Sequence, residues 1–400
     1  MAGRGTLRER GNNKWELTVA LGIEGGKQVR KYCTVTANTK REAERLLARF
    51  VTDIESGYVG DNRNTKLEDF IETWLRDYAE KNLAPKTLFR YKQLTKRIKS
   101  ALGHLKLEKI KPTHLLSFYN NLLEPGIRQD NRQQDPDTKK QLKGLSERTV
   151  LHYHRLLHTV LEAAVQWQYI AINPASRVKP PKVPKTQMAC YDDQQVGLML
   201  LALRQEPINY QALVWLAVST GMRQGEIMGL EWKHIDLSSG TIRVEQAAQY
   251  IPGQGNFLKL PKNEYSRRVV AAPPAVMQLL KEHKAAQNEI RLQLGSKWQG
   301  DDRVFTQYNG KPMYANSMSN WFPDFAKRHN LPHMNFHGLR HTCASLLIAD
   351  GATVSDLSKN LGHSNSSTTL NVYSHSFQKA NEKLASKMGD ILSKATSGTK

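Results

Sequence analysis

Four side chains that can act together on a phosphate ester lie in the last quarter of the chain. His337 and Arg340 are three residues apart, His363 follows a Leu-Gly pair, and Tyr373 comes ten residues later. An arginine can bind two phosphate oxygens at once, an imidazole can move a proton, and a phenol can attack phosphorus and hold it as an ester. Tyrosine is the covalent nucleophile of this set. The combination predicts phosphoryl transfer without a metal ion.

A second arginine that could bind phosphate lies far upstream, within Thr220–Glu226. There a glycine turn meets the start of a predicted helix, which places Arg223 at a helix N-terminus. Exposed backbone amides and the helix dipole favour an anion at that position. Arg223 therefore lies at a position that is favourable for phosphate.

The charge balance of the whole chain indicates a polyanionic partner. Its 400 residues include 58 Lys and Arg against 37 Asp and Glu, a formal net charge of +21. Double-stranded DNA fits, because neutralising its phosphates releases counterions and gives affinity that does not depend on sequence. A merely basic protein is the alternative on charge alone. Apolar residues make up 39% of the chain, enough for packed cores, and three scattered cysteines favour reduced thiols.

The first structural unit that the sequence predicts is a small one over residues 1–60. Apolar and polar residues alternate over 15–23, with Leu21 among the inward positions, and a second strand follows over 29–36. A capping box at Thr39–Glu42 starts a helix whose apolar stripe runs from Ala43 to Ile54. The outer face of this sheet is expected to enter a DNA groove with basic side chains: Arg8, Arg10, Lys14, Lys27, Arg30 and Lys31.

A helical part over residues 65–175 is predicted next, after a linker at 57–62. Its helices are expected at 66–80, 85–101, 112–123 and 146–169, with a polar insertion at 124–144. Ten Lys and Arg but one acid lie between Lys81 and Lys111, which predicts a face that follows the phosphate backbone. Its residues are Lys86, Arg90, Lys92, Lys96 and Lys99.

The segment Arg177–Lys185, rich in proline and lysine, marks the clearest boundary. Behind it, residues 188–380 are expected to be mostly helical, with strands near 241–246 and 266–271, and a tail with a short amphipathic helix follows over 381–400. His154 and His158 have the spacing of a metal pair, but no third ligand is evident, so no metal is predicted. The sequence holds no apolar run that could span a membrane and no apolar signal core at its start, so a cytoplasmic protein is expected.

These residues together resemble the motifs of the tyrosine recombinase, or phage integrase, family. Six positions in the family's order span about 150 residues, which makes the match specific. The resemblance implies a mainly α fold with small β elements, in which residues 1–60 bind arm-type DNA, 65–175 bind the core site and 188–380 carry catalysis. The matching motifs are Arg223 with Glu226, Lys262 before Arg267-Arg268, His337-x-x-Arg340, Leu361-Gly362-His363 and Tyr373.

The resemblance also implies residue roles. Tyr373 would join the DNA 3′ phosphate and free a 5′ hydroxyl, while Arg223 and Arg340 would clamp the phosphate oxygens. Lys262 would be the general acid, with Lys259 as a rival because hairpin register cannot be read from sequence. His337 would assist proton transfer, His363 would hydrogen-bond the phosphate, and Glu226 would orient Arg223. His341 is expected to serve helix packing.

The implied activity is site-specific recombination that integrates and excises a mobile element. It would need no cofactor, metal or ATP, and would act as a homotetramer on core and arm sites, near the host nucleoid. An excision factor and a host DNA-bending protein are the further partners implied. A DNA-binding regulator that does not cleave and a relaxase like type IB topoisomerases are the alternatives. The sequence leaves five questions open: the sequence of the attachment site, whether the element is a phage or a conjugative element, how the direction of recombination is controlled, whether cleavage occurs in cis or in trans, and whether the terminal helix is exchanged between subunits.

Overall fold

The chain forms two compact units, Met1–Lys185 and Thr186–Lys400. The computed structural model describes residues 5–24, 27–55, 64–127, 144–184, 188–260, 267–363 and 365–397. The linker predicted at 57–62, residues 128–143 of the predicted insertion, and Lys262 lie outside these ranges. No helix within them is long and apolar enough to cross a bilayer. The fold is mainly α with small sheets, as the sequence predicts.

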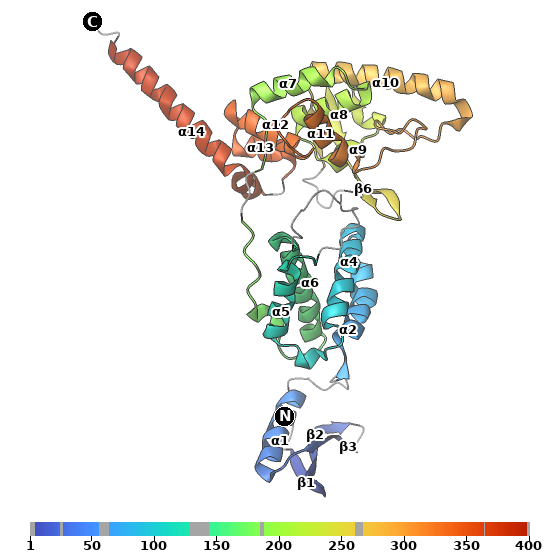
Figure 1. The fold of residues 1–400 in the computed structure, drawn as a ribbon, viewed down its shortest axis with the longest axis vertical. Coiled ribbons are helices and arrows are strands. Elements are labelled where there is room, and N and C mark those ends of the chain that lie inside the picture. Colours follow the sequence, from blue (N-terminus) through green and yellow to red (C-terminus); the bar gives the residue numbers. More distant parts are fainter. Residues whose placement is uncertain are drawn as a thin grey trace. The chain divides into compact units, whose positions relative to one another are not determined.

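The first unit begins with three antiparallel strands, β1 (Thr6–Gly11), β2 (Lys14–Glu24) and β3 (Lys27–Thr36), paired in that order (Figure 1). The alternation predicts β2 and β3 but misses β1, in which Leu7 is the one apolar residue that faces the core. Trp15, Leu17 and Val19 are buried, as predicted, and pack with helix α1 (Lys40–Glu55). The strand-strand-helix prediction is therefore short by one strand.

Two further predictions for this sheet, the inward position of Leu21 and the outward position of Lys31, are wrong. The register shifts between Ala20 and Gly22, and Leu21 at the bulge is 40% exposed instead of facing the core. Lys31 lies opposite Val19, and residues directly opposite in an antiparallel pair share a face. Lys31 therefore lies on the α1 side of the sheet and not on the predicted outer face.

The described residues of the rest of the first unit include four helical segments, which lie within a few residues of their predicted bounds. The first is α2 (Leu67–Trp74) with a π-helical turn, η2 (Leu75–Ala79), and α3 (Glu80–Asn82); the others are α4 (Pro85–Leu102), α5 (Pro112–Leu123) and α6 (Glu147–Gln166). Proline at the first position of α4 and α5 and the Ser146 cap of α6 fix these starts. Short 3₁₀ turns η3 (Leu107–Lys109) and η4 (Pro174–Arg177) complete the unit.

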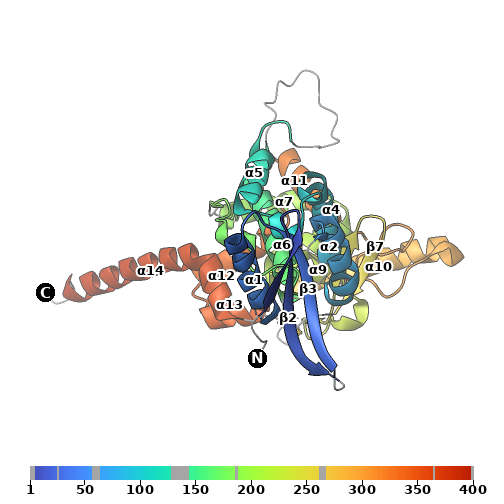
Figure 2. The same cartoon turned by 90° about the horizontal axis from the view of Figure 1, so that it is seen from below.

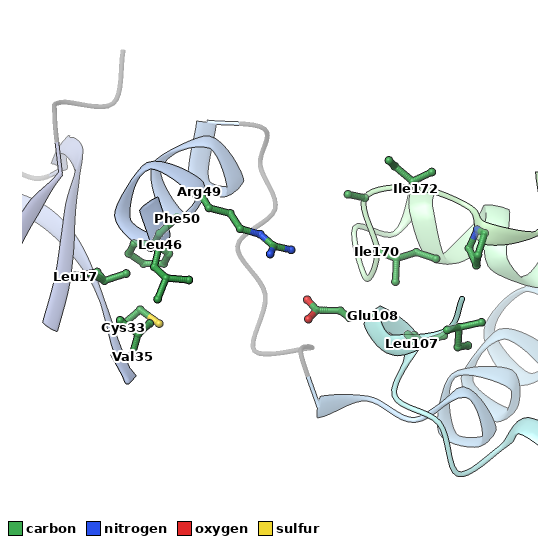
Figure 3. A pocket seen from close by; sticks show the side chains of 13 residues that line it. Leu17, Cys33, Val35, Leu46, Arg49, Phe50, Leu107, Glu108, Ile170 and Ile172 are labelled. Carbon is green, nitrogen blue, oxygen red and sulfur yellow. The ribbon is translucent and has the colours of Figure 1, made fainter. Parts of the chain in front are cut away.

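Figure 3 shows a pocket of the first unit whose lining residues are mainly apolar but include Arg49 and Glu108. Leu17, Cys33 and Phe50 are among the side chains that line it from the sheet and α1, and Leu107 and Ile170 among those from the helical part. Its lining holds no group of side chains with evident chemistry, and we assign it none. The residues that carry the candidate chemistry all belong to the second unit.

The second unit surrounds a buried helix, α8 (Ile208–Thr220), with α7 (Asp193–Leu203), α10 (Pro274–Leu294) and α12 (Gly338–Ala349) among its neighbours (Figure 1). One sheet has the order β4 (Ile235–Asp236), β5 (Thr241–Val244), β8 (Arg268–Ala271). The two predicted strands are thus present and paired. A hairpin of β6 (Ala247–Ile251) and β7 (Gly255–Lys259) is an addition that the sequence reading missed. This part of the second unit also contains two further helices and two 3₁₀ turns: α9 (Gln224–Met228), α11 (Ser317–Arg328), η5 (Trp232–His234) and η7 (Gly295–Lys297).

The last helices bring the C-terminal motif residues together. Helix α13 (Val354–Leu361) ends at Gly362, and α14 (Ser366–Ser397) runs outwards from α12 and α13 (Figures 1 and 2). A helix follows the kink at Tyr373, as predicted, but it runs to Ser397 and is longer than the short helix expected. Only Tyr373 interrupts the described backbone of α14, with φ −111° and ψ 15°. Met388, which lies in the segment predicted to form an amphipathic helix, is 55% exposed.

Candidate active site

Arg223 lies at the N-cap of α9, as its glycine turn predicts. Gly221 ends α8 with a left-handed φ of 64°, and a Cβ there would lie 2.7 Å from Leu361 Cδ2. Only glycine combines this φ with so close an approach to the end of α13. The turn therefore fixes Arg223 beside the segment that carries His363.

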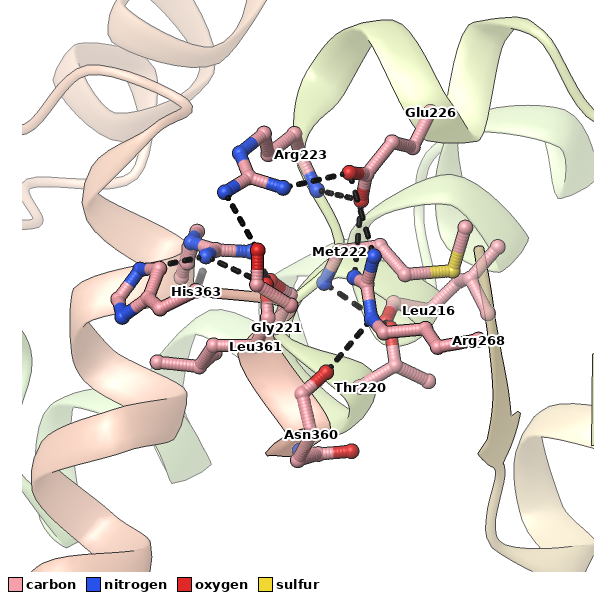
Figure 4. Close-up of polar contacts among 12 residues, drawn as sticks. Leu216, Thr220, Gly221, Met222, Arg223, Glu226, Arg268, Asn360, Leu361 and His363 are labelled. Carbon is pink, nitrogen blue, oxygen red and sulfur yellow. Dashed lines mark hydrogen bonds and ion pairs between the residues drawn. The ribbon is translucent and has the colours of Figure 1, made fainter. Parts of the chain in front are cut away.

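A carboxylate shared by two arginines holds Arg223 in place (Figure 4). Glu226 accepts from the backbone N–H of Arg223 at 2.9 Å and from its Nη1 at 2.7 Å. Arg268 on β8 donates to the same carboxylate over 2.9 Å, and its Nε donates to the carbonyl of Asn360 over 2.7 Å. Arg268 thus connects the sheet, Glu226 and the end of α13.

Glu226 stays ionised although it is 6% exposed. Burial alone would raise the pKa of this carboxyl, but hydrogen bonds and positive charge from Arg268 and then Arg223 outweigh burial and lower it. A buried carboxylate needs such partners, because an unpaired buried charge is strongly destabilising. Glu226 therefore holds the guanidinium groups of Arg223 and Arg268, and its supporting role in the reaction stays a prediction.

Arg340 on α12 reaches three neighbours from a side chain that is nearly buried. Its Nη1 donates to the Gly221 carbonyl over 2.7 Å, and its Nη2 donates to the Leu361 carbonyl over 2.7 Å and to His363 Nε2 over 2.9 Å. Burial, followed by the positive charge of Arg223, lowers its pKa to about 10, so the guanidinium remains charged at neutral pH. Arg340 therefore joins the α8–α9 turn to the segment that carries His363.

The hydrogen bonds of His363 set its tautomer. Arginine can only donate, so Nε2 accepts from Arg340 and Nδ1 carries the proton, which it donates to Thr369 Oγ1 over 2.7 Å. Burial and then the charges of Arg340, Arg223 and Arg268 lower the pKa of His363 to about 4. The ring is therefore neutral at pH 7. In this structure its Nε2 faces Arg340, so the predicted hydrogen bond to a phosphate would require Arg340 to release it.

Tyr373 is buried, with 4% of its surface exposed. Its hydroxyl lies 3.0 Å from Nδ1 of His341, which follows Arg340 directly on α12. Helix packing is thus an incomplete account of His341, because its ring contacts the candidate nucleophile. His337 caps α12 and its ring centroid lies 5.0 Å from that of His341. Desolvation and then the charges of Arg340 and Arg223 lower the pKa of His337.

The structure does not distinguish between the two candidates for the general acid, Lys262 and Lys259. Lys262 lies outside the described residues, while Lys259 ends β7. Both assignments therefore rest on sequence alone. Arg268, His341 and Thr369 are the site residues that the sequence reading did not assign. For Arg268 the signal was its place beside Arg267 in the matched motif, and for His341 it was its spacing of four from His337.

The predicted DNA-binding residues lie in the first unit. Arg8, Arg10, Lys14 and Arg30 are exposed on the outer face of the sheet, where Arg10 pairs with Glu16 over 2.6 Å; the side chain of Lys27 is not described. On α4, Lys92 pairs with Glu80 over 2.6 Å and Lys99 pairs with Glu72. These pairs are exposed and contribute little stability. The remaining predicted residues of α4, Lys86, Arg90 and Lys96, are exposed.

Comparison with known proteins identifies the family. A model of the phage integrase family matches residues 191–380, and one of the N-terminal SAM-like domain of phage integrases matches residues 66–123, together more than half of the chain. The chain belongs to the phage integrase family of tyrosine recombinases. The recombinase is therefore an enzyme that cleaves and rejoins DNA strands.

Relatives of the recombinase match it over nearly its whole length. A protein named tyrosine recombinase XerC-like, of Caldanaerobacter subterraneus subsp. tengcongensis, is 29% identical over 98% of this chain and all of its own. The ICEBs1 integrase of Bacillus subtilis is 24% identical over 95% of this chain and 98% of its own. Among solved structures, the Tn1549 transposon integrase in complex with a circular intermediate DNA has a TM-score of 0.63, with 20% identity over 80% of this chain and 99% of the other. This last likeness establishes the shared fold.

Proposed function

We propose that this recombinase integrates and excises a mobile genetic element, by cleaving DNA at specific sites and holding it through Tyr373. The observation that carries the proposal is the charge around a buried phenol. Arg223 and Arg268 share the carboxylate of Glu226, whereas the third guanidinium group, that of Arg340, donates to backbone carbonyls and to His363. The resulting excess of positive charge beside Tyr373 suits a DNA phosphate.

The reaction follows from these groups. Tyr373 Oη bonds to the scissile phosphorus, the bond from phosphorus to the 5′ oxygen breaks, and Lys262 donates a proton to that leaving oxygen. The phenol loses its proton, and His337 at the start of α12 assists that transfer. Arg223 and Arg340 bind the non-bridging oxygens. Attack by a 5′ hydroxyl of another strand reverses these steps and leaves exchanged strands, so the energy of the broken bond is kept in the phosphotyrosine.

The electrostatics explain why both arginines are needed. Burial raises the pKa of Tyr373 to about 12, so the phenol is a weak nucleophile until positive charge neutralises the phosphate that it attacks. Removing one such electrostatic contact typically costs about 3–4 kcal/mol in barrier, a factor of hundreds in rate. Replacing either Arg223 or Arg340 would therefore slow cleavage without removing the nucleophile.

The proposal extends to the assembly. The recombinase would bind core sites through the helical part of its first unit and arm sites through the outer face of the N-terminal sheet. It would act as a tetramer on two duplexes, aided by an excision factor and a host DNA-bending protein, at the host nucleoid. The names of the relatives support a mobile-element role, because the ICEBs1 integrase and the Tn1549 transposon integrase are both named for such elements.

A trapping experiment tests the proposal. The footprint of the chain on the DNA that flanks its own gene identifies the site, and a duplex of that sequence with a nick beside the cleavage position prevents rejoining. Wild-type protein should form a covalent adduct with this duplex, whereas Tyr373→Phe should bind it and form none. Absence of a wild-type adduct would support the non-cleaving regulator. Relaxation of supercoils without exchange between two duplexes would support the relaxase.

A further inference from the structure

Arg340 and His341 are adjacent on α12, but their side chains contact different parts of the second unit. Consecutive helical residues point about 100° apart, so one side chain faces the α8–α9 turn while the next faces α14. Arg340 contacts the carbonyls of Gly221 and Leu361, and His341 contacts the hydroxyl of Tyr373. Arg340 directly precedes His341 in the chain. The contact between His341 and Tyr373 thus fixes the phenol next to Arg340.

The contact is enclosed by protein. His341 is 7% exposed and Tyr373 is 4% exposed. Apolar neighbours Ala344, Ile348 and Leu361 pack with the tyrosine in one cluster. A buried phenol requires a hydrogen-bond partner, and the ring nitrogen of His341 supplies it. Apolar packing therefore holds the ring of Tyr373, while His341 decides where its oxygen lies.

The other nitrogen of His341 shows that this contact has a cost. In either tautomer of His341 that pairs Nδ1 with the phenol, its buried Nε2 has no hydrogen-bond partner within the described residues. A buried donor or acceptor without a partner is unfavourable. A histidine kept in this position at such a cost is better explained by placement of the nucleophile than by stability of the fold.

We propose that His341 is a positioning residue for the nucleophile, which accepts the hydrogen bond of the Tyr373 phenol and holds its oxygen beside Arg340. This inference rests on the proposed role of Tyr373. His341 acts here as an acceptor and leaves the proton on the phenol. Burial raises the pKa of Tyr373 to about 12, whereas burial and the nearby charges of His337, Arg340 and His363 lower that of His341 to about 4. Both values favour the neutral pair.

The kinetic test uses two substitutions that separate placement from proton transfer. In His341→Asn the amide oxygen can take the place of Nδ1 and accept from the phenol, but it does not titrate; His341→Ala removes the acceptor. On the nicked duplex, His341→Ala should form adduct at least about tenfold more slowly than wild type, with unchanged DNA affinity, and His341→Asn should recover most of that loss. His333→Ala, an exposed histidine of the same unit, is the matched control and should behave as wild type.

Two outcomes would overturn the inference. Wild-type rates in His341→Ala would show that the contact is dispensable, and equal loss in both variants would show that the ring must titrate. Failure of the wild-type protein to form any adduct would instead contradict the proposed function.

A second measurement needs no DNA. With 3-fluorotyrosine incorporated, the ¹⁹F signal of Tyr373 is identified by its loss in Tyr373→Phe. That signal should shift in His341→Ala, return towards its wild-type position in His341→Asn, and stay in place in His333→Ala. An unshifted signal in His341→Ala would mean that the hydrogen bond is absent in solution, and would overturn the inference whatever the cleavage rates are.

Discussion

Arg340 donates a hydrogen bond from Nη2 to Nε2 of His363 over 2.9 Å. This bond ties a residue of α12 to one in the loop after α13, and it requires the proton of His363 to lie on Nδ1. The same arginine contacts the turn that positions Arg223. Two arginines that would bind one phosphate are thus held by protein acceptors, Arg223 by the carboxylate of Glu226 and Arg340 by backbone carbonyls and the imidazole of His363.

Thr369 should affect the rate of cleavage, because it helps to set the tautomer of His363. Thr369 is fully buried and accepts from Nδ1 of that ring, so Thr369→Val leaves the N–H without a partner. We expect adduct formation on the nicked duplex to slow by about tenfold, the equivalent of about 1.4 kcal/mol. Thr369→Ser keeps the hydroxyl and should react as wild type. A Val variant with the wild-type rate would show that the tautomer is set elsewhere.

Arg268 should be essential for the stability of the second unit. Arg268→Met leaves the buried Glu226 with one arginine instead of two, and breaking a buried pair typically costs about 3–5 kcal/mol. Hydrogen exchange of peptides from α9 and α13 should accelerate accordingly. Arg243→Met, at an exposed pair with Glu245, is the control and should change exchange by less than about 1 kcal/mol. Equal protection in both variants would contradict the bridging role of Arg268.

Gly221 and Gly197 should respond in opposite directions to alanine. Gly221 has φ 64° and no room for a Cβ beside Leu361, so Gly221→Ala should destabilise the second unit by at least about 1 kcal/mol and slow cleavage by displacing Arg223. Gly197 lies on an exposed face of α7, where an added methyl would meet nothing within 4 Å, so Gly197→Ala should stabilise by about 0.5–1 kcal/mol. Hydrogen exchange of α7 and α8 would reveal both changes.

The buried His341 and the half-buried His363 should make the second unit sensitive to acid. The pKa values of His341 and His363 are lowered to about 4, below the ordinary value near 6.5, so the unfolded chain binds these protons first. Their contribution to stability is complete above pH 6.5 and is lost as the pH falls towards 4. Unfolding of wild type should therefore become easier between pH 6.5 and 4, and less so for His341→Asn. Identical pH profiles would contradict the lowered pKa of His341.

Exposed and paired basic residues of α4 should differ in their effect on DNA binding. Lys86, Arg90 and Lys96 are exposed, whereas Lys92 and Lys99 pair with carboxylates. Replacing the first three with Gln should reduce the slope of log affinity against log salt by about 2 to 3, because each phosphate contact contributes about 0.9. The double replacement of Lys92 and Lys99 should change it by about 1 or less. An unchanged slope in the triple variant would remove α4 from the DNA interface.

Local sequence patterns were sufficient for most elements of the fold. Helices α4, α5 and α6 start at a proline or a serine cap and carry apolar stripes, so neighbouring residues alone determine where they begin and which face is buried. Strand β1 has too few apolar residues to be recognised. The bulge at Leu21 could not be foreseen either, because an extra residue in a strand changes which side chains share a face.

The sequence by itself determined which side chains are available for the chemistry and in what order they occur. Arg223, His337, Arg340, His363 and Tyr373 are identifiable from residue type and spacing, because phosphoryl transfer by a phenol needs these groups. Only the tertiary structure decided their partners. The sharing of Glu226 by Arg223 and Arg268, and the contact of His341 with Tyr373, depend on how helices and strands distant in sequence pack, and no local pattern encodes that packing.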